Sequence, residues 1–310
     1  MQGTVVEWTN CNLCGSDRTE LYREGHDRQL GGSEHFCLVH CLQCGLIYLN
    51  PRPNRDEISR YYPADYEPFT RLSRHQGGRL ARWSYRRYLD KRCARLPKTP
   101  GRLLDVGCAT GDFLARAREH GWQVQGVEPG EAAAEAARQQ YGLDVFTGDL
   151  AQAHFPYGGF DAVTLWDVLE HVTDPRAELA EIHRILRADG LLLIELPNLR
   201  SFDAVLFGPY WIGLDMPRHL HIFPPAALDA LLEQTGFRVV SRRCSSGGYG
   251  AFVASLNFWG AEQSSRWVRR LATSLSRHPT WQWLLLPYVY LAYAAGRGPE
   301  ITLLCRKRAG

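Results

Sequence analysis

Short apolar runs alternate with amphipathic stretches along most of the chain beyond residue 100. Apolar runs of this length, bounded by turn-forming residues, predict strands at 102–106, 123–128, 143–147, 160–166 and 190–196. Helical stretches such as 131–140 and 176–187 separate them. Two later runs, 237–243 and 301–306, predict strands that complete the sheet, with a long helical insertion at 247–298 between them. This order predicts an α/β fold with a doubly wound, mostly parallel sheet.

The strand at 102–106 leads into a glycine turn within GRLLDVGCATGD, residues 101–112. Gly107 and Gly111 let backbone N–H groups approach a ligand closely, beside a helix N-terminus. In open α/β sheets such sites lie at the carboxyl ends of the strands. The turn therefore predicts a site for a nucleotide-like ligand, with Asp105 near the charged tail of that ligand.

Acidic residues follow the next two strands. Glu128 ends the second strand in GVEPG, where a carboxylate can accept hydrogen bonds from two ribose hydroxyls. Asp149 follows the third strand in GDL, where it can accept from an adenine amino group while the N–H of Leu150 donates to the ring. Each alone fits a surface carboxylate or a helix cap, but carboxylates after three successive strands favour a nucleoside site.

Two CxxC pairs, each followed by glycine, stand near the N-terminus. Their cysteines are Cys11, Cys14, Cys41 and Cys44. Four thiolates at this spacing are the ligand set of a closed, tetrahedral structural zinc site, and the glycines allow the positive φ of a tight turn. Cys37, His35 and His40 fall outside the repeated pattern. Residues 1–70 are therefore predicted to form a small zinc-ribbon module.

An arginine-rich stretch connects this module to the sheet domain at 101–310. Residues 71–100 predict a basic linker helix with a solvated charged face, and a cradle for phosphates is the alternative. Just before it, Tyr61, Tyr62 and Tyr66 fit either ordinary packing or the wall of an acceptor pocket.

Composition indicates the class of the protein and the compartment in which we expect it. The 310 residues are 45% hydrophobic and 22% charged, typical of a globular chain, and a net charge of +3 is too small to argue for nucleic acid by itself. The N-terminus lacks a basic stretch followed by an apolar core of signal-peptide length. The nine cysteines then indicate thiols and metal ligands in a reducing compartment rather than disulfides, and we expect a cytoplasmic protein.

The motifs LDVGCATGDF, GVEP, GDL and FDAVTLWDVLEHVTDP, in this order, resemble class I S-adenosylmethionine-dependent methyltransferases over residues 100–245. The resemblance implies a seven-stranded, Rossmann-like sheet whose last strand is antiparallel. It also implies a donor site formed by Asp105, Gly107, Cys108, Gly111, Glu128, Asp149, Leu150 and Trp166. Ala109 stands where the family commonly has glycine, and we expect it to be tolerated if it avoids positive φ. It also breaks the GxGxxG motif of a nicotinamide enzyme.

The N-terminal half narrows the resemblance further. A CxxC pair followed by CGLIYLNPRP and YYPADY is similar to bacterial methyltransferases of polysaccharide or natural-product assembly, including sugar C-methyltransferases with a zinc-binding domain. This similarity implies a small-molecule acceptor, a sugar or a nucleotide-linked sugar, methylated at carbon or oxygen.

Three histidines are candidates for taking the acceptor's proton. His219 and His221 lie in MPRHLHIFPP and share one side of the segment if it is extended. His219 matches a histidine of the sugar C-methyltransferases, but Arg218 replaces their glutamate, and an arginine there can neutralise an anionic acceptor. His171 follows Glu170 after the fourth strand. We expect its main role to be lining the pocket, with a role in catalysis as the second possibility. Structural hydrogen bonding within the loop is the alternative for His219 and His221.

Two further segments leave their roles open. Asn198 ends the fifth strand and fits either orientation of the acceptor or a turn after proline. Residues 281–295 are apolar nearly all round but too short to span a membrane, and Arg266, Arg269, Arg270 and Arg277 precede them. This pattern fits a helix on a membrane surface, whereas a lid or a homodimer interface would bury the same side chains.

Other functions are open besides methylation of a sugar. They are an RNA methyltransferase with a zinc module, a methyltransferase for a lipid, quinone-like or other natural-product acceptor, and a non-catalytic S-adenosylmethionine-binding protein. The fourth strand ends in LWDV, without the Asn/Asp-Pro-Pro-aromatic motif of many amino-directed nucleic-acid methylases. We therefore favour a small-molecule acceptor over nucleic acid.

Overall fold

The computed structural model describes residues 5–63, 79–245, 248–277 and 281–308. Its central sheet has the order β12 (Phe237–Ser245), β13 (Glu300–Lys307), β10 (Leu186–Pro197), β9 (Phe160–Trp166), β6 (Arg102–Val106), β7 (Gln123–Glu128) and β8 (Val145–Thr147). The strands from β10 to β8 are parallel, whereas β13 is antiparallel to both of its neighbours. The predicted fold class, the seven strands and the antiparallel last strand are confirmed.

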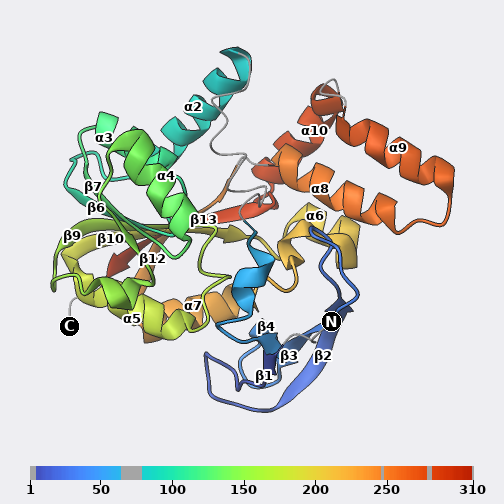
Figure 1. The fold of residues 1–310 in the computed structure, drawn as a ribbon, viewed down its shortest axis with the longest axis horizontal. Coiled ribbons are helices and arrows are strands. Elements are labelled where there is room, and N and C mark those ends of the chain that lie inside the picture. The colour runs from blue at the N-terminus through green and yellow to red at the C-terminus, as the bar shows by residue number, and fades with distance from the viewer. Residues whose placement is uncertain (1–4, 64–78, 246–247, 278–280, 309–310) are drawn as a thin grey trace.

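Helices cover both faces of this sheet (Figure 1). The helices α2 (Arg79–Cys93), α3 (Asp112–Glu119) and α4 (Glu131–Tyr141) pack on one face, and α5 (Pro175–Ile185) and α7 (Pro225–Gln234) pack on the other. Successive residues of a strand point to opposite faces, so Leu103 joins the first layer and Leu104 joins the second. Because both layers are buried, the parallel strands are continuous apolar runs rather than alternating ones.

The N-terminal module is built around a second, smaller sheet. Its strand order is β11 (His221–Ile222), β4 (Ile47–Leu49), β3 (Phe36–Cys41) and β2 (Thr19–Gly25), while β1 (Val6–Glu7) pairs with β5 (Arg52–Pro53). A short 3-10 helix, η1 (Ile58–Tyr61), follows β5. Since β11 comes from the segment after β10, the edge of the small sheet is completed by the chain that carries the candidate histidines.

The predicted helical insertion between β12 and β13 consists of α8 (Gly248–Ala261), α9 (Arg266–Arg277) and α10 (Trp281–Ala294), at the upper right of Figure 1. The helix α8 packs on α6 (Phe202–Phe207) and on the two 3-10 turns η3 (Gly208–Tyr210) and η4 (Ile212–Leu214). Within the described ranges, every helix is too short or too polar to cross a bilayer. The insertion therefore stands on the loop that leads to His219.

Candidate active site

The glycine turn after β6 adopts the conformation that its sequence predicts. Gly107 and Gly111 have φ of +69° and +80°, and α3 begins directly after Gly111. A Cβ at Gly107 would lie 2.6 Å from a methyl carbon of Val168, and one at Gly111 would lie 2.9 Å from Cβ of Ala137. Both positions therefore require glycine, for backbone conformation and for space.

Ala109, in the middle of this turn, does not avoid positive φ, which was the condition for expecting alanine to be tolerated there. Its φ is +46°, so the methyl side chain occupies the left-handed region that glycine adopts more easily. The backbone N–H of Ala109 donates to Oε2 of Glu128 at 2.9 Å, which helps to hold the turn in place. The turn thus keeps its shape at a conformational cost of about 1 kcal/mol.

Glu128 lies at the carboxyl end of β7 with its side chain 4% exposed. Its carboxylate accepts only from backbone amides in the described structure, from Ala109 and, at 2.8 Å, from Gly130. Burial raises the pKa of Glu128, while these amides favour its charged form. Asp149 caps the 3-10 helix η2 (Leu150–Ala153) and pairs with Arg55 of the N-terminal module, and Leu150 is buried beneath it.

Asp105 and Cys108 lie deeper, under the turn. Oδ1 of Asp105 accepts from the hydroxyl of Thr164 on β9 at 2.6 Å, and burial raises the pKa of Asp105 to about 7. The thiol of Cys108 is buried against β7, where a Cβ on Gly126 would lie 2.6 Å from Sγ. Both residues support the floor of the turn.

Trp166 ends β9 beneath the guanidinium of Arg92 from α2, at 4.6 Å from the ring centre. Its indole N–H is buried and has no partner among the described residues. Arg92 is buried as well, and it donates to Glu195 at 2.7 Å and to Asp167 at 3.1 Å. The expectation of a solvated basic face on the linker helix is therefore wrong at Arg92, because this arginine neutralises carboxylates at the ends of β9 and β10.

His171 and His219 meet in a buried cluster just beyond these strand ends. Their ring centres are 4.7 Å apart, and a polar side-chain atom of Glu170 lies within 4.8 Å of a ring nitrogen of each. The Nδ1 of His219 donates to the carbonyl of Gly213 at 2.8 Å, and that of His171 donates to a backbone carbonyl of the same loop at 2.9 Å. Because each Nδ1 carries the proton, each Nε2 keeps its lone pair and is free to accept one.

The two rings differ in basicity. Burial and the neighbouring ring lower the pKa of His171 to about 3. Burial also lowers the pKa of His219, but the Asp215 carboxylate and the Gly213 carbonyl oppose this effect. Burial raises the pKa of Glu170 well above its usual range, and its oxygens have no hydrogen-bond partner in the described structure. His219 is therefore the better proton acceptor of the pair.

Tyr62 closes the cluster from the N-terminal module. Its hydroxyl lies 2.9 Å from Nδ1 of His171, with the rings edge to face. Tyr61 is directed elsewhere and donates to Glu34, and Tyr66 lies outside the described residues. Of the three candidate tyrosines, the structure therefore brings Tyr62 to the histidines.

His221 and Arg218 have other surroundings than the sequence predicts. The Nε2 of His221 faces Asn12 at 3.3 Å, and its ring stacks on Phe223, so the structure does not bring it to the histidine pair. Arg218 is 0% exposed and binds two carboxylates bidentately, Asp27 of the N-terminal module at 2.7 Å and Asp215 at 2.7–2.9 Å. The expectation that Arg218 neutralises an anionic acceptor is therefore wrong, because its charge is already balanced by these buried acids.

Asn198 makes the turn after β10. Its amide donates to the carbonyl of Gly298 at 2.8 Å, and its side-chain oxygen accepts from the N–H of Arg200 at 3.0 Å. These bonds join the end of β10 to the start of β13. Of the two roles left open by the sequence, they support the turn.

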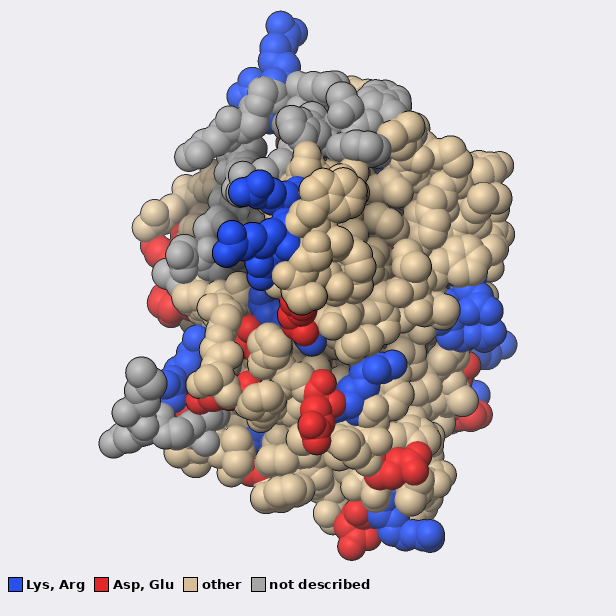
Figure 2. All heavy atoms as spheres, turned by 90° about the vertical axis from the view of Figure 1, so that its right-hand side faces the viewer, with Lys and Arg blue, Asp and Glu red and all other residues tan. Residues whose placement is uncertain are grey.

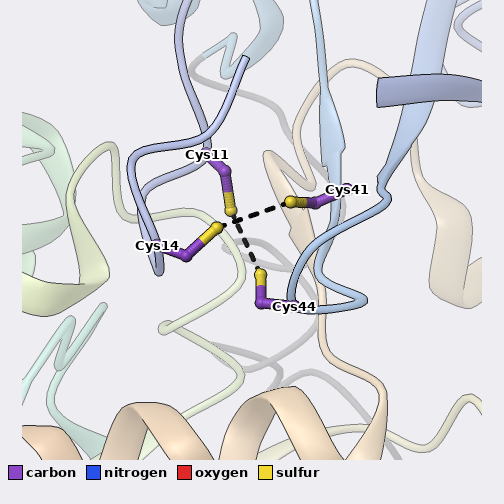
Figure 3. Close-up of side chains that lie close together, drawn as sticks. All are labelled: Cys11, Cys14, Cys41 and Cys44. Carbon is purple, nitrogen blue, oxygen red and sulfur yellow. Dashed lines mark hydrogen bonds between the residues drawn. The ribbon is translucent and has the colours of Figure 1, made fainter. Parts of the chain in front are cut away.

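The four cysteines of the CxxC pairs converge in the N-terminal module (Figure 3). The sulfurs of Cys11 and Cys44 are 3.4 Å apart, those of Cys14 and Cys41 are 3.5 Å apart, and all four lie within 4.8 Å of one another. Tetrahedral thiolates at a zinc–sulfur distance of about 2.3 Å would be about 3.8 Å apart. The tight turns after the two pairs place Gly15 and Gly45 at φ of +75° and +79°. The four sulfurs are close enough together to be the ligands of one four-coordinate metal ion.

Comparison with known proteins places this site in a family. The family model described as "Methyltransferase domain" matches residues 80–242, just over half of the chain. The chain belongs to the S-adenosylmethionine-dependent methyltransferases.

Two similar proteins and one solved structure illustrate the range of this family. A ubiquinone biosynthesis O-methyltransferase from Ruegeria sp. is 31% identical over 153 residues, which are 46% of this chain and 62% of that protein. One from Pseudomonas paraeruginosa is 31% identical over 166 residues, 49% of this chain and 69% of that protein. The fold is shared with a methyltransferase from Archaeoglobus fulgidus, with a TM-score of 0.50, 19% identity, and coverage of 78% of this chain and all of the other.

The donor site of this methyltransferase fits S-adenosylmethionine. The glycine turn leaves no room for side chains, and a buried carboxylate at Glu128 faces backbone amides in the same turn. The N-terminal module contributes Arg55, Tyr62 and Asp27, and of these the sequence offered only Tyr62, as one of three candidates for the wall of an acceptor pocket. Only Tyr62 had a signal, as an aromatic residue beside a turn, because nothing near Asp27 indicates a partner nearly two hundred residues away.

Proposed function

We propose that this methyltransferase transfers the methyl group of S-adenosylmethionine to a hydroxyl oxygen of a small molecule, with His219 as the general base. The observation that carries the proposal is the bond from Nδ1 of His219 to Gly213, which leaves Nε2 unprotonated in a buried site. S-adenosylmethionine supplies a methyl group activated by a positively charged sulfur. The hydroxyl proton passes to Nε2 as the acceptor oxygen takes the methyl group.

The surrounding residues orient this base. Arg218, held by Asp27 and Asp215, fixes the loop that carries His219, and the carboxylate of Asp215 stabilises the imidazolium that forms. His171, with its much lower pKa, stays neutral and lines the pocket. We assign His171 and Tyr62 to binding of the acceptor hydroxyl, because both end in polar atoms beside His219.

For the acceptor we favour a ring hydroxyl of a quinone-like compound over a nucleotide-linked sugar. The relatives from Ruegeria and Pseudomonas paraeruginosa are named as ubiquinone biosynthesis O-methyltransferases. The arginine that would have met a nucleotide phosphate, Arg218, is buried and already paired. A sugar hydroxyl without a phosphate is the second candidate, supported by the similarity of the N-terminal half to sugar-modifying enzymes.

We also propose that Cys11, Cys14, Cys41 and Cys44 hold a structural Zn²⁺. Two of them, Cys11 and Cys41, are buried among apolar residues of both modules. Four free thiols would stabilise this cluster little, whereas thiolates bound to zinc would stabilise it directly. Metal analysis should find one zinc per chain, and chelation should lower the melting temperature of the protein. Protein that carries no zinc and is unmoved by chelation would refute this assignment.

Calorimetry and methyl transfer test the proposed function. Glu128→Gln should weaken S-adenosylmethionine binding by about 10- to 100-fold, because the amide places an N–H group against the N–H groups of Ala109 and Gly130. The matched control is Glu131→Gln, on the exposed first turn of α4. Labelled methyl should then appear as an ether on ring hydroxyls or sugar hydroxyls. Absence of donor binding, or transfer to RNA alone, would contradict the proposal.

A further inference from the structure

The outer face of α10 is apolar and unusually exposed. Its exposed side chains are Leu284, Leu286, Tyr290, Leu291 and Tyr293, and the exposed fractions of Leu284 and Tyr290 are 67% and 72%. The helix α10 contains no charged residue. A surface helix normally presents polar or charged residues to water. An apolar outer face of this extent indicates a surface that another body covers.

The helix α9, which packs on α8 as α10 does, supplies positive charge to the insertion. Arg266, Arg269 and Arg270 are exposed beside Trp267 and Leu271, and none of these arginines forms an ion pair with another described residue. No Asp or Glu stands between Glu262 and Glu300 in the sequence. Figure 2, which faces this end of the molecule, shows a broad uncharged area with Lys and Arg at its margins and with Asp and Glu below it.

We propose that this insertion face, formed by Arg266–Leu271 of α9 and Leu284–Tyr293 of α10, docks on an anionic membrane surface. Arginines attract acidic lipid headgroups, while exposed tryptophan, tyrosine and leucine enter the boundary between headgroups and acyl chains. The contact is peripheral, since the described helices do not span a bilayer.

The charge pattern argues for a membrane rather than for a second copy of the chain. A twofold interface would place the same patch on both sides, so that arginines met a surface that holds no acidic residue. An anionic bilayer provides the missing negative charge.

The insertion face is connected to the active site through α8. Phe252 of α8 packs on Tyr288 of α10 and on Phe207 of α6, with ring centres 5.3 Å and 5.1 Å apart. Ser255 of α8 accepts from the N–H of Ile212, in the loop that leads to His219. A docked insertion face would therefore hold the loop that leads to His219 close to the bilayer. The docking does not depend on which acceptor is methylated.

Flotation with lipid vesicles tests the proposal. The 310-residue chain should float with phosphatidylcholine vesicles that contain phosphatidylglycerol and remain in the soluble fraction with phosphatidylcholine alone. The triple change Arg266→Glu, Arg269→Glu and Arg270→Glu should lower partitioning onto the anionic vesicles by at least about 100-fold. The triple change Leu284→Ser, Tyr290→Ser and Leu291→Ser should lower it to a similar degree.

Matched controls lie away from the insertion. Arg238→Glu on β12 and Tyr157→Ser, which removes a ring that is 76% exposed, should leave flotation unchanged. All variants should bind S-adenosylmethionine as the unmodified chain does, which shows that they are folded. Protein that stays soluble with anionic vesicles would overturn the proposal. A dimer in solution that the three serine substitutions convert to a monomer, without vesicle binding, would assign the face to a second copy instead.

Discussion

The replacement His219→Asn separates the proposed base from its structural role. An asparagine amide can donate to the carbonyl of Gly213 as Nδ1 of histidine does at 2.8 Å, so the loop keeps its anchor. The substitution removes Nε2 and with it the lone pair that would take the proton. His171 is a poor substitute because its pKa is lowered to about 3.

The expected loss follows from the burial of this residue. Removing a general base typically costs about 10²- to 10⁴-fold in rate, which corresponds to about 3–5 kcal/mol of transition-state free energy. His219 is only 8% exposed, so bulk water cannot easily act as a base in its place. We therefore expect kcat for methyl transfer to fall by at least about 100-fold in His219→Asn.

Radiolabelled methyl transfer and calorimetry provide the assay. The dissociation constant for S-adenosylmethionine should stay within about twofold, since the histidine is not part of the donor site. The matched control is His120→Asn, an exposed histidine beside Asp90 at the end of α3. Because burial lowers the pKa of His219, kcat/KM of the unmodified enzyme should fall with acidity only below about pH 6.5. A His219→Asn variant with unchanged kcat would refute the reasoning.

Three further predictions concern residues in and around the site. The pKa of Asp105 is about 7 in the folded protein and about 3.8 in the unfolded chain. The folded protein therefore holds this proton more tightly, and the free energy of unfolding falls as pH rises between these two values. In urea unfolding, the free energy of unfolding of Asp105→Asn should therefore rise by about 2–3 kcal/mol relative to that of the unmodified chain as pH increases from 5 to 8. A difference between the two proteins that does not change with pH would contradict the raised pKa. Ala109→Gly should raise stability by up to about 1 kcal/mol, because glycine adopts φ of +46° without strain, and a loss of stability would show that the turn tolerates alanine. Asp27→Asn should lower stability by about 2–4 kcal/mol by unbalancing Arg218, with a matched Asp17→Asn control expected to show no effect.

The sheet domain was predictable from the sequence because its signals are local. Buried parallel strands are apolar on both faces, so runs such as 102–106 and 160–166 are visible without knowledge of their neighbours. The glycine turn is also local, since Gly107 and Gly111 are required by backbone conformation. The two CxxC pairs were visible for the same reason, as short repeated spacings.

The acceptor side was predictable only in part, because its residues come from separate segments. His171 and His219 are 48 positions apart and meet only when the loop after β9 packs against the loop before β11. The sequence placed His219 and His221 together by their spacing, but β11 pairs with β4 and turns His221 toward Asn12. Tyr62 enters from a module that the sequence treats as separate.

The sequence by itself determined the fold class, the donor turn and the four-cysteine cluster, because each depends on backbone conformation or on contacts between near neighbours. The tertiary structure decided which polar groups are free to act. Arg218 has the charge of an anion-binding residue, yet Asp27 and Asp215 already pair with it in the folded chain. His219 is buried as a structural histidine would be, yet the bond from its Nδ1 to Gly213 leaves the lone pair of Nε2 available. Charge and lone pairs are properties of residues, whereas their availability depends on which partners the folded chain brings within reach.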